Sequence, residues 1–178
     1  ARIGDDVQIG DYAQIGIGAR IGDDAQIGDD AQIGDGAQIG SYAWIGSYAR
    51  IGDDAQIGIG AHIGDGARIG DDAQIGDDAQ IGNGAQIGNG TWLGDDAHIG
   101  NGARIGDGAR FVLNLGADLR GYTLHAYAVD GVLRITGDGA DIALPEAREY
   151  WADNPWMLAA CDYAERLYAI ATAKPHDC

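Results

Sequence analysis

The hydrophobic positions of the first two thirds of the chain repeat every six residues without interruption. An aliphatic residue stands at every sixth position from Ile3 to Ile105, which gives 18 hexads in which only Leu93 replaces Ile. Glycine follows each aliphatic residue. Four places after the aliphatic residue stands Ala, replaced once by Val7 and once by Thr91. No helical or heptad period fits the consensus Ile-Gly-Asp-(Asp/Gly)-Ala-Gln.

The alternation within each hexad separates an inner face from an outer one. Neighbouring side chains of a strand point to opposite faces, so the Ile and Ala of Ala-Gln-Ile-Gly point inward and Gln points outward. The two positions after the glycine hold turn residues, and Gly, Asn and Asp tolerate the positive φ that a tight corner needs. We therefore expect an all-β solenoid with three sides per coil. Six coils would be about 29 Å long, since stacked strands lie about 4.8 Å apart.

The repeat resembles that of the hexapeptide-repeat superfamily, whose members fold into a left-handed parallel β-helix. The resemblance covers residues 1–110, about 60% of the chain, and it alone implies the left hand, because crossover rules favour the opposite one. The superfamily includes acyltransferases that use coenzyme A or acyl carrier protein, γ-class carbonic anhydrases and non-enzymatic relatives. Many members are trimers. The resemblance therefore implies a fold but no single function.

The composition changes near residue 110, which predicts a second unit over residues 111–178. The first 110 residues hold 26 of the 31 glycines, whereas all three prolines and both cysteines come later. We expect strands over about 111–115, 122–129, 131–136 and 141–144, and helices over about 145–152 and 155–173. These elements would form a small α+β cap over the open end of the solenoid. The pattern Tyr-Thr-Leu-His-Ala-Tyr, then Gly-Val-Leu-Arg-Ile, resembles modules of uncharacterised phage and bacterial hexapeptide proteins.

The formal net charge of −17 is shared by both units, and residues 1–110 carry 18 Asp but six Arg. Such a surface repels phosphate backbones and anionic lipids, so we expect no nucleic acid and no membrane as partner. No membrane span or signal peptide is evident, and a cytoplasmic or virion-associated location is the expectation. Cys161 and Cys178 indicate neither a disulfide framework nor a zinc site, and whether they pair stays open.

Two histidines occupy the outward position of the hexad. His62 and His98 fall on one side of the prism, two coils or about 9.6 Å apart, with Gln80 between them. This separation is too long for an easily shared metal ion. No arrangement of serine, histidine and acid is indicated by the register. His62 is therefore the catalytic candidate only if the chain is an acyltransferase.

Aromatic residues interrupt the polar surface in the third coil. Tyr42, Trp44 and Tyr48 follow one another there, His62 stands beside Trp44 one coil later, and Tyr12 shares the corner of Tyr48. Exposed aromatic residues gathered in one patch are typical of interfaces and of ligand platforms. We expect a protein partner or a second copy of the chain to bind there. The alternatives are that the patch binds a small ligand or a sugar, or that these exposed aromatic residues have no function.

Carboxylates stack along one corner of the predicted prism. Asp35, Asp53 and Asp71 occupy equivalent places in three successive coils, with Asp54 and Asp72 next to them. Carboxylates about 4.8 Å apart repel one another, and a hard cation such as calcium could bridge them. Solvated turns are the simpler interpretation, so we predict no metal and no cofactor and keep these residues as metal candidates.

The unbroken array favours a non-enzymatic structural or interaction protein. Superfamily acyltransferases usually extend a loop from the solenoid, and no hexad here contains an insertion. The chain would then be a rigid acidic rod with a C-terminal cap, and a phage origin is one hypothesis for it. It would bind a protein partner or self-associate, for example as a homo-oligomer. The alternative is an acyltransferase-like enzyme that uses acyl-coenzyme A.

Overall fold

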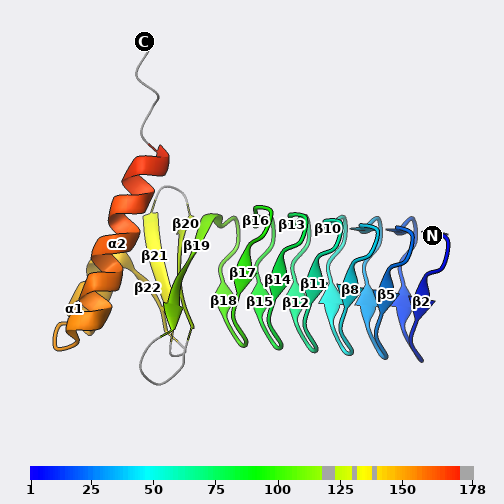
Figure 1. Ribbon diagram of the computed structural model, residues 1–178, viewed down its shortest axis with the longest axis horizontal. Helices are drawn as coiled ribbons and strands as arrows, with labels where there is room; N and C mark the ends of the chain where they lie inside the picture. The colour runs from blue at the N-terminus through cyan, green and yellow to red at the C-terminus, as the bar shows by residue number, and fades with distance from the viewer. Residues whose placement is uncertain (118–122, 130–131, 138–139, 173–178) are drawn as a thin grey trace, which may run out of the picture.

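A computed structural model shows a straight three-sided solenoid that ends in an α+β cap (Figure 1). The structure describes residues 1–117, 123–129, 132–137 and 140–172. Each 18-residue coil contributes one strand to each of three parallel sheets, and each sheet has six strands. The parallel β-solenoid of six coils that the repeat predicts is therefore confirmed.

We name the three sheets side A, side B and side C. Side A contains β1 (Arg2–Ile3), β4 (Arg20–Ile21), β7 (Gln38–Ile39), β10 (Gln56–Ile57), β13 (Gln74–Ile75) and β16 (Trp92–Leu93). Side B contains β2 (Gln8–Ile9), β5 (Gln26–Ile27), β8 (Trp44–Ile45), β11 (His62–Ile63), β14 (Gln80–Ile81) and β17 (His98–Ile99). Side C contains β3 (Gln14–Ile15), β6 (Gln32–Ile33), β9 (Arg50–Ile51), β12 (Arg68–Ile69), β15 (Gln86–Ile87) and β18 (Arg104–Ile105).

The inward Ile and Ala positions form the solenoid core, as the alternation predicts. From the second coil onward the inward Ile side chains are buried, and most inward alanines have no exposed surface. Burying one such Ile stabilises the fold by about 1.5–3 kcal/mol. Ile3 and Ile9 in the first coil stay largely exposed because no coil covers their outer side. Thr91 takes an alanine position and remains buried because its hydroxyl donates to the Gly106 carbonyl at 3.0 Å.

The glycine after each Ile is required by the close approach of successive coils. A Cβ atom at Gly52 would lie 2.5 Å from the amide nitrogen of Asp71 in the next coil, well inside van der Waals contact. The N–H of Gly52 also donates to the Ile69 carbonyl at 2.8 Å, which holds the two backbones together. Gly94 occupies the same hexad position in the last coil, where an added Cβ would meet nothing within 4 Å.

The cap is an antiparallel sheet backed by two helices. Its strands β19 (Arg110–Ala117), β20 (Thr123–Val129), β21 (Val132–Gly137) and β22 (Ala140–Ala143) lie in chain order. Helices α1 (Leu144–Tyr150) and α2 (Pro155–Thr172) lie on the side of this sheet that faces away from the solenoid (Figure 1). Every predicted element is present, with its ends shifted by up to two residues. The predicted hairpin turn at 130–131 and Cys178 lie outside the described residues.

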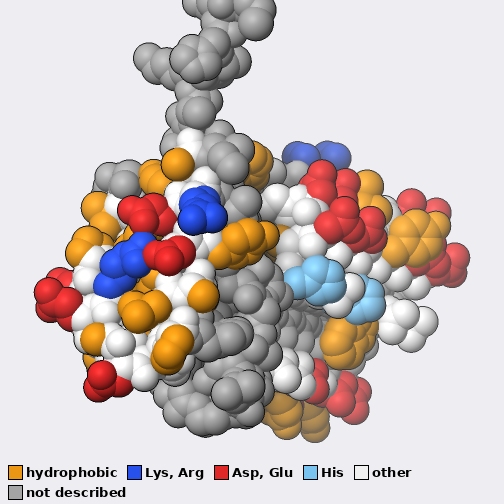
Figure 2. Space-filling model, turned by 60° about the vertical axis from the view of Figure 1, so that its left-hand side comes forward, with side chains coloured by type: hydrophobic (Ala, Val, Ile, Leu, Met, Phe, Trp, Pro, Cys, Tyr) orange, Lys and Arg blue, Asp and Glu red, His pale blue; other side chains and the backbone are white. Residues whose placement is uncertain are grey.

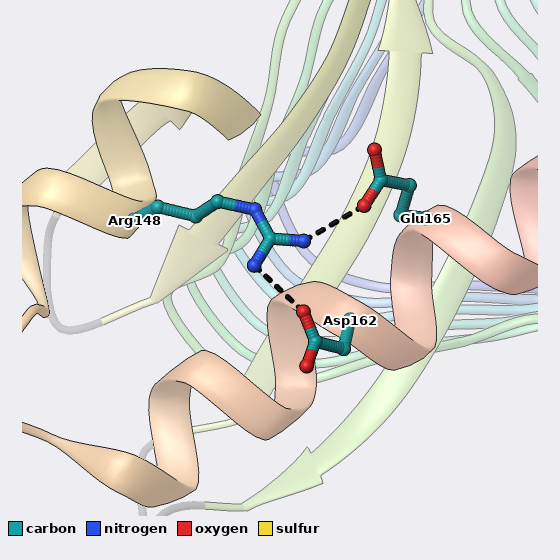
Figure 3. Close-up of polar contacts among 3 residues, drawn as sticks. All are labelled: Arg148, Asp162 and Glu165. Atoms are coloured by element: carbon teal, nitrogen blue, oxygen red, sulfur yellow. Dashed lines mark hydrogen bonds and ion pairs between the residues drawn. The ribbon is translucent and has the colours of Figure 1, made fainter.

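The two helices are joined by packing and by one arginine. Arg148 of α1 donates to Asp162 at 2.6 Å and to Glu165 at 2.7 Å, both on α2 (Figure 3). At the start of α2, Asn154 accepts the Met157 N–H at 3.2 Å, as the predicted N-cap requires. Cys161 is buried in the interface, and burial raises the pKa of its thiol. None of the described helices has the length and apolarity needed to span a bilayer.

Two side chains of β20 accept backbone N–H groups of the last coil. Within the solenoid the glycine that follows each inward aliphatic residue donates its N–H to the carbonyl of the equivalent aliphatic residue in the next coil, and the sixth coil has no next coil. The Gly100 N–H donates instead to His125 Nε2 at 3.2 Å, and the Gly106 N–H donates to the Tyr127 hydroxyl at 3.3 Å. Both side chains are fully buried. Burial lowers the pKa of His125 to about 4, although the His98 backbone carbonyl acts in the opposite direction.

Candidate functional site

An open groove runs along side B from its third to its sixth strand. The outward residues of β8, β11, β14 and β17 stand in register there, because each strand pairs with the equivalent strand one coil away. The groove has a volume of about 340 Å³. Its polar and aromatic lining consists of Trp44, His62, Gln80, Asn83, His98 and Asn101. Histidine side chains gather on this flank of the solenoid, behind the cap (Figure 2).

Trp44 and His62 are neighbours, as the spacing of 18 residues predicts. Their strands pair in register, and their ring centroids lie 6.0 Å apart with the planes tilted by 48°. Gln80 separates His62 from His98, so the two imidazoles stand two strands apart. That is about 9.6 Å along the sheet, too far for the two rings to act on one metal ion. The structure thus brings His62 together with Trp44 and keeps His98 apart.

Tyr42 and Tyr48 lie at the two corners that flank β8. Their exposed fractions are 63% and 65%, and Trp44 between them is 38% exposed. Both tyrosines have a left-handed backbone, with φ of 61° and 59°, and so does Tyr12 with 60°. Apart from Tyr12, which is equivalent to Tyr48, the other coils place Asp or Gly at these positions. A left-handed backbone at a bulky residue costs about 1–2 kcal/mol, so the fold itself gives no reason for these tyrosines.

Trp44 also forms one wall of a second groove, on its N-terminal side. This groove has a volume of about 310 Å³ and is lined by Gln8, Gln26, Asp29, Trp44 and Ser47, together with the backbone of the first two coils. Trp44 therefore divides the surface of side B into two adjoining grooves, one with the histidines and one with glutamines. The predicted patch of Tyr42, Trp44, Tyr48 and His62 lies across this division.

The stacked aspartates have a structural task. The N–H of Ile17 donates to Asp35 Oδ1 at 2.6 Å, that of Asp35 to Asp53 Oδ1 at 2.8 Å, and that of Asp53 to Asp71 Oδ1 at 3.0 Å. Each carboxylate thus satisfies a corner amide of the preceding coil. In the part of the chain that the structure describes, no three or more His, Cys, Asp or Glu side chains are arranged to hold a metal ion. The geometry gives no support to a cation at these residues.

Sequence reasoning missed the asparagines of the groove. Asn83 and Asn101 follow one another along the corner between sides B and C, one and two coils after Asp65. Their Oδ1 atoms accept backbone N–H groups of the preceding coil, from Asp65 at 3.0 Å and from Asn83 at 2.8 Å. The change from Asp to Asn at this corner was a visible signal, because it removes negative charge next to both histidines.

The comparison with family models identifies the repeat. The model described as bacterial transferase hexapeptide (six repeats) matches residues 12–47, 48–83 and 72–107, which together cover more than half of the chain. Proteins with this repeat commonly form trimers, which agrees with the self-association expected from the sequence. A comparison with curated protein sequences found no match.

Solved structures share the fold. The chain is similar to a hexapeptide transferase family protein from Anaplasma phagocytophilum, with a TM-score of 0.58 and 18% identity over 96% of this chain and 83% of that one. It is also similar to the UDP-N-acetylglucosamine O-acyltransferase of Moraxella catarrhalis, with a TM-score of 0.42 and 19% identity over 58% of each chain. A third similar structure is the acetyltransferase domain of PglB from Neisseria gonorrhoeae. Its TM-score is 0.29, and the identity is 19% over 59% of this chain and 50% of that one.

The family model contradicts the prediction of a non-enzymatic structural protein, because the family that it describes is one of bacterial transferases. The prediction relied on the missing loop. Its error has a physical reason, because a flat side of the prism presents histidines in an open groove without any insertion. Of the two hypotheses from the sequence, only the alternative describes a transferase, so it is the one that agrees with the family model.

Proposed function

Because the chain belongs to the bacterial transferase hexapeptide family, we propose that it transfers an acyl group from a coenzyme A thioester to a nucleophilic acceptor in the groove of side B. The observation that supports this site is the groove itself, in which His62, His98 and three carboxamide side chains line one surface. Imidazole is the side chain best suited to exchange protons near neutral pH. Carboxamides donate hydrogen bonds to carbonyl oxygens and carry no charge of their own.

His62 is the general base of this proposal. Its imidazole takes the proton from an acceptor hydroxyl or amine while the oxygen or nitrogen attacks the thioester carbonyl. The carbon–sulfur bond then breaks, and the imidazolium returns the proton to the departing thiolate. The tetrahedral oxyanion needs hydrogen-bond donors, which the Nδ2 group of Asn83 can supply because its Oδ1 already accepts the Asp65 N–H.

The position of His62 favours it over His98. His62 stands on β11, which pairs with a strand on each side, and its ring lies 6.0 Å from that of Trp44. An acceptor held against the indole would therefore be next to this imidazole. His98 stands on β17, the last strand of side B, beside the cap.

The substitution His62→Gln tests this assignment without disturbing the repeat, since Gln is the usual residue at that position. Loss of a general base lowers turnover about 10²–10⁴-fold. We therefore expect a drop of that size in thiol release from acetyl-coenzyme A, measured with a thiol reagent in the presence of glucosamine or with water alone as acceptor. The unfolding midpoint should stay unchanged.

His98→Gln is the matched control, because it makes the same replacement on the same side. We expect it to keep most of the activity of the unaltered chain. If His62→Gln is as active as the unaltered chain, His62 is not the general base. If the unaltered chain neither releases thiol nor gains thermal stability when acetyl-coenzyme A is added, the proposed function itself is wrong.

A further inference from the structure

One face of β20 lies against the last coil of the solenoid (Figure 1). His125 and Tyr127 are fully buried on this face, and the partly buried Val129 packs against the solenoid core. Neighbouring side chains of a strand point to opposite faces, so Ala126 points the other way and belongs to the core of the cap. Alternate residues of β20 therefore make two different contacts, one with the solenoid and one within the cap.

The solenoid and the cap have separate hydrophobic cores. The inward aliphatic and alanine side chains form the solenoid core together with Tyr127, whereas Leu133, Ile135, Trp151 and Cys161 are among the residues of the cap core. In the part of the chain that the structure describes, no buried residue belongs to both cores. Separating the cap from the last coil would expose Tyr127 and the end of the solenoid core but would leave the cap core packed. The contact between the two units can therefore open without unfolding either unit.

The contact between cap and solenoid needs a neutral His125. Its Nε2 atom accepts the Gly100 N–H at 3.2 Å, so the neutral ring carries its proton on Nδ1. A second proton would go to Nε2 and turn this acceptor into a donor that faces another donor. Nδ1 has no hydrogen-bond partner in the described part of the chain, and the attraction of the His98 carbonyl does not offset the loss of water around a charged ring. The docked cap therefore favours the neutral ring.

The elements packed against His125 do not compensate a positive charge on it. β19 places Asn114, which does not titrate, opposite His125 in register. β21 has the cation Arg134 on the same face, and Asp141 of β22 stands in the same cross-strand row two strands away, about 9.6 Å and out of hydrogen-bond reach. The helices lie on the other side of the sheet (Figure 1). The last coil meets the ring with its backbone, since the side chain of His98 is exposed on the outer surface.

We propose that protonation of His125 releases the cap from the last coil as one body, so that the end of the solenoid opens at acidic pH while both cores stay folded. The release reaches the groove of side B, because His98, Gly100 and Asn101 line the end of that groove. It does not depend on acyl transfer. A weaker binding of the acyl donor at acidic pH follows from it only if the proposed function holds.

Amide hydrogen exchange of the full chain, followed by NMR at pH 7 and pH 5, measures this opening. Protection factors, which are corrected for the intrinsic exchange rate at each pH, report the equilibrium between closed and open forms. The pKa of His125 is about 4 when it is buried and 6.5 when it is exposed, so opening is about 20-fold more favourable at pH 5 than at pH 7. We expect the protection factors of the Gly100 and Gly106 amides to fall together by about that factor.

Amides inside each unit are the internal controls. The Gly64 N–H donates to the Ile81 carbonyl at 2.8 Å within side B, and the Trp151 N–H donates to the Ala147 carbonyl at 3.0 Å within the cap. Both amides should keep their protection factors at pH 5, because neither bond crosses between the two units. If either amide loses as much protection as Gly100, a unit unfolds instead of separating, and the proposal is overturned.

Two variants assign the pH dependence to His125. His125→Gln keeps an acceptor for the Gly100 N–H but does not titrate between pH 7 and 5, so its Gly100 protection factor should be equal at both pH values. Tyr127→Phe is the matched control, because it removes the acceptor of the Gly106 N–H without changing a group that titrates in this range. It should keep the roughly 20-fold fall. Two results would overturn the proposal: a Gly100 protection factor that is constant in the unaltered chain, or the same fall in His125→Gln.

Discussion

At the scale of single residues, the glycine after each isoleucine sets the distance between coils. Its missing side chain lets the next backbone approach, so that the glycine N–H reaches the Ile carbonyl one coil away, as from Gly52 to Ile69 at 2.8 Å. The same distance fixes the register of the outward residues. Side chains 18 residues apart, such as Trp44 and His62, therefore become neighbours. The geometry of the site thus depends on residues that never contact a ligand.

Gly52→Ala should destabilise the solenoid, and Gly94→Ala should not. The added methyl at Gly52 would lie 2.5 Å from the Asp71 amide nitrogen, and relieving that overlap costs about 1–3 kcal/mol of unfolding free energy. At Gly94 the methyl meets nothing within 4 Å, and the stiffer unfolded chain should add about 0.4–1 kcal/mol of stability. Chemical denaturation measures both. Equal effects of the two substitutions would show that coil contact is not why glycine is needed.

At the scale of elements, β20 closes the solenoid with side chains where a coil would use its backbone. His125 and Tyr127 alternate along the strand onto one face and accept the Gly100 and Gly106 N–H groups. The sequence predicted this strand, because its alternation of residues is plain. It did not predict the role of His125, since that role depends on which face of the cap meets the last coil. Contacts between the solenoid and the cap do not follow the six-residue repeat, so residue spacing does not predict them.

The cap should weaken as the pH falls from neutral toward 5. His125 has a pKa of about 4 in the folded chain against 6.5 in the unfolded one, so the unfolded chain binds the proton first. The contribution of His125 is complete above pH 6.5 and is lost as the pH falls toward 4. Between pH 7 and 5 this amounts to about 2 kcal/mol of unfolding free energy.

His125→Gln isolates this titration from that of the acidic residues. Its amide oxygen can still accept the Gly100 N–H but does not titrate in this range. We expect its unfolding free energy, measured by denaturant titration at several pH values, to fall less between pH 7 and 5 than that of the unaltered chain. Parallel pH profiles of the two proteins would mean that His125 is not responsible.

At the scale of the whole molecule, one repeat determines the shape and leaves the outward positions free to vary. The solenoid could be predicted from the sequence because burial of Ile and Ala every six residues permits one coil geometry. The neighbours Trp44 and His62 followed from it by counting. The grooves could not be predicted in this way, because they arise from the relative sizes of side chains on three or four coils at once. The resemblance to the hexapeptide-repeat superfamily is confirmed by the family model, but the choice of a structural protein was wrong, since it took a missing loop for a missing site.

The central claim is that the groove of side B receives an acyl donor next to His62. The most direct test is an NMR titration of the isotope-labelled chain with acetyl-coenzyme A that follows the imidazole signals of the histidines. We predict saturable shifts for His62, smaller ones for His98, and none for His125, which is buried between the cap and the last coil. Signals of His62 that stay fixed at saturating donor, or that move no more than those of His125, would contradict it.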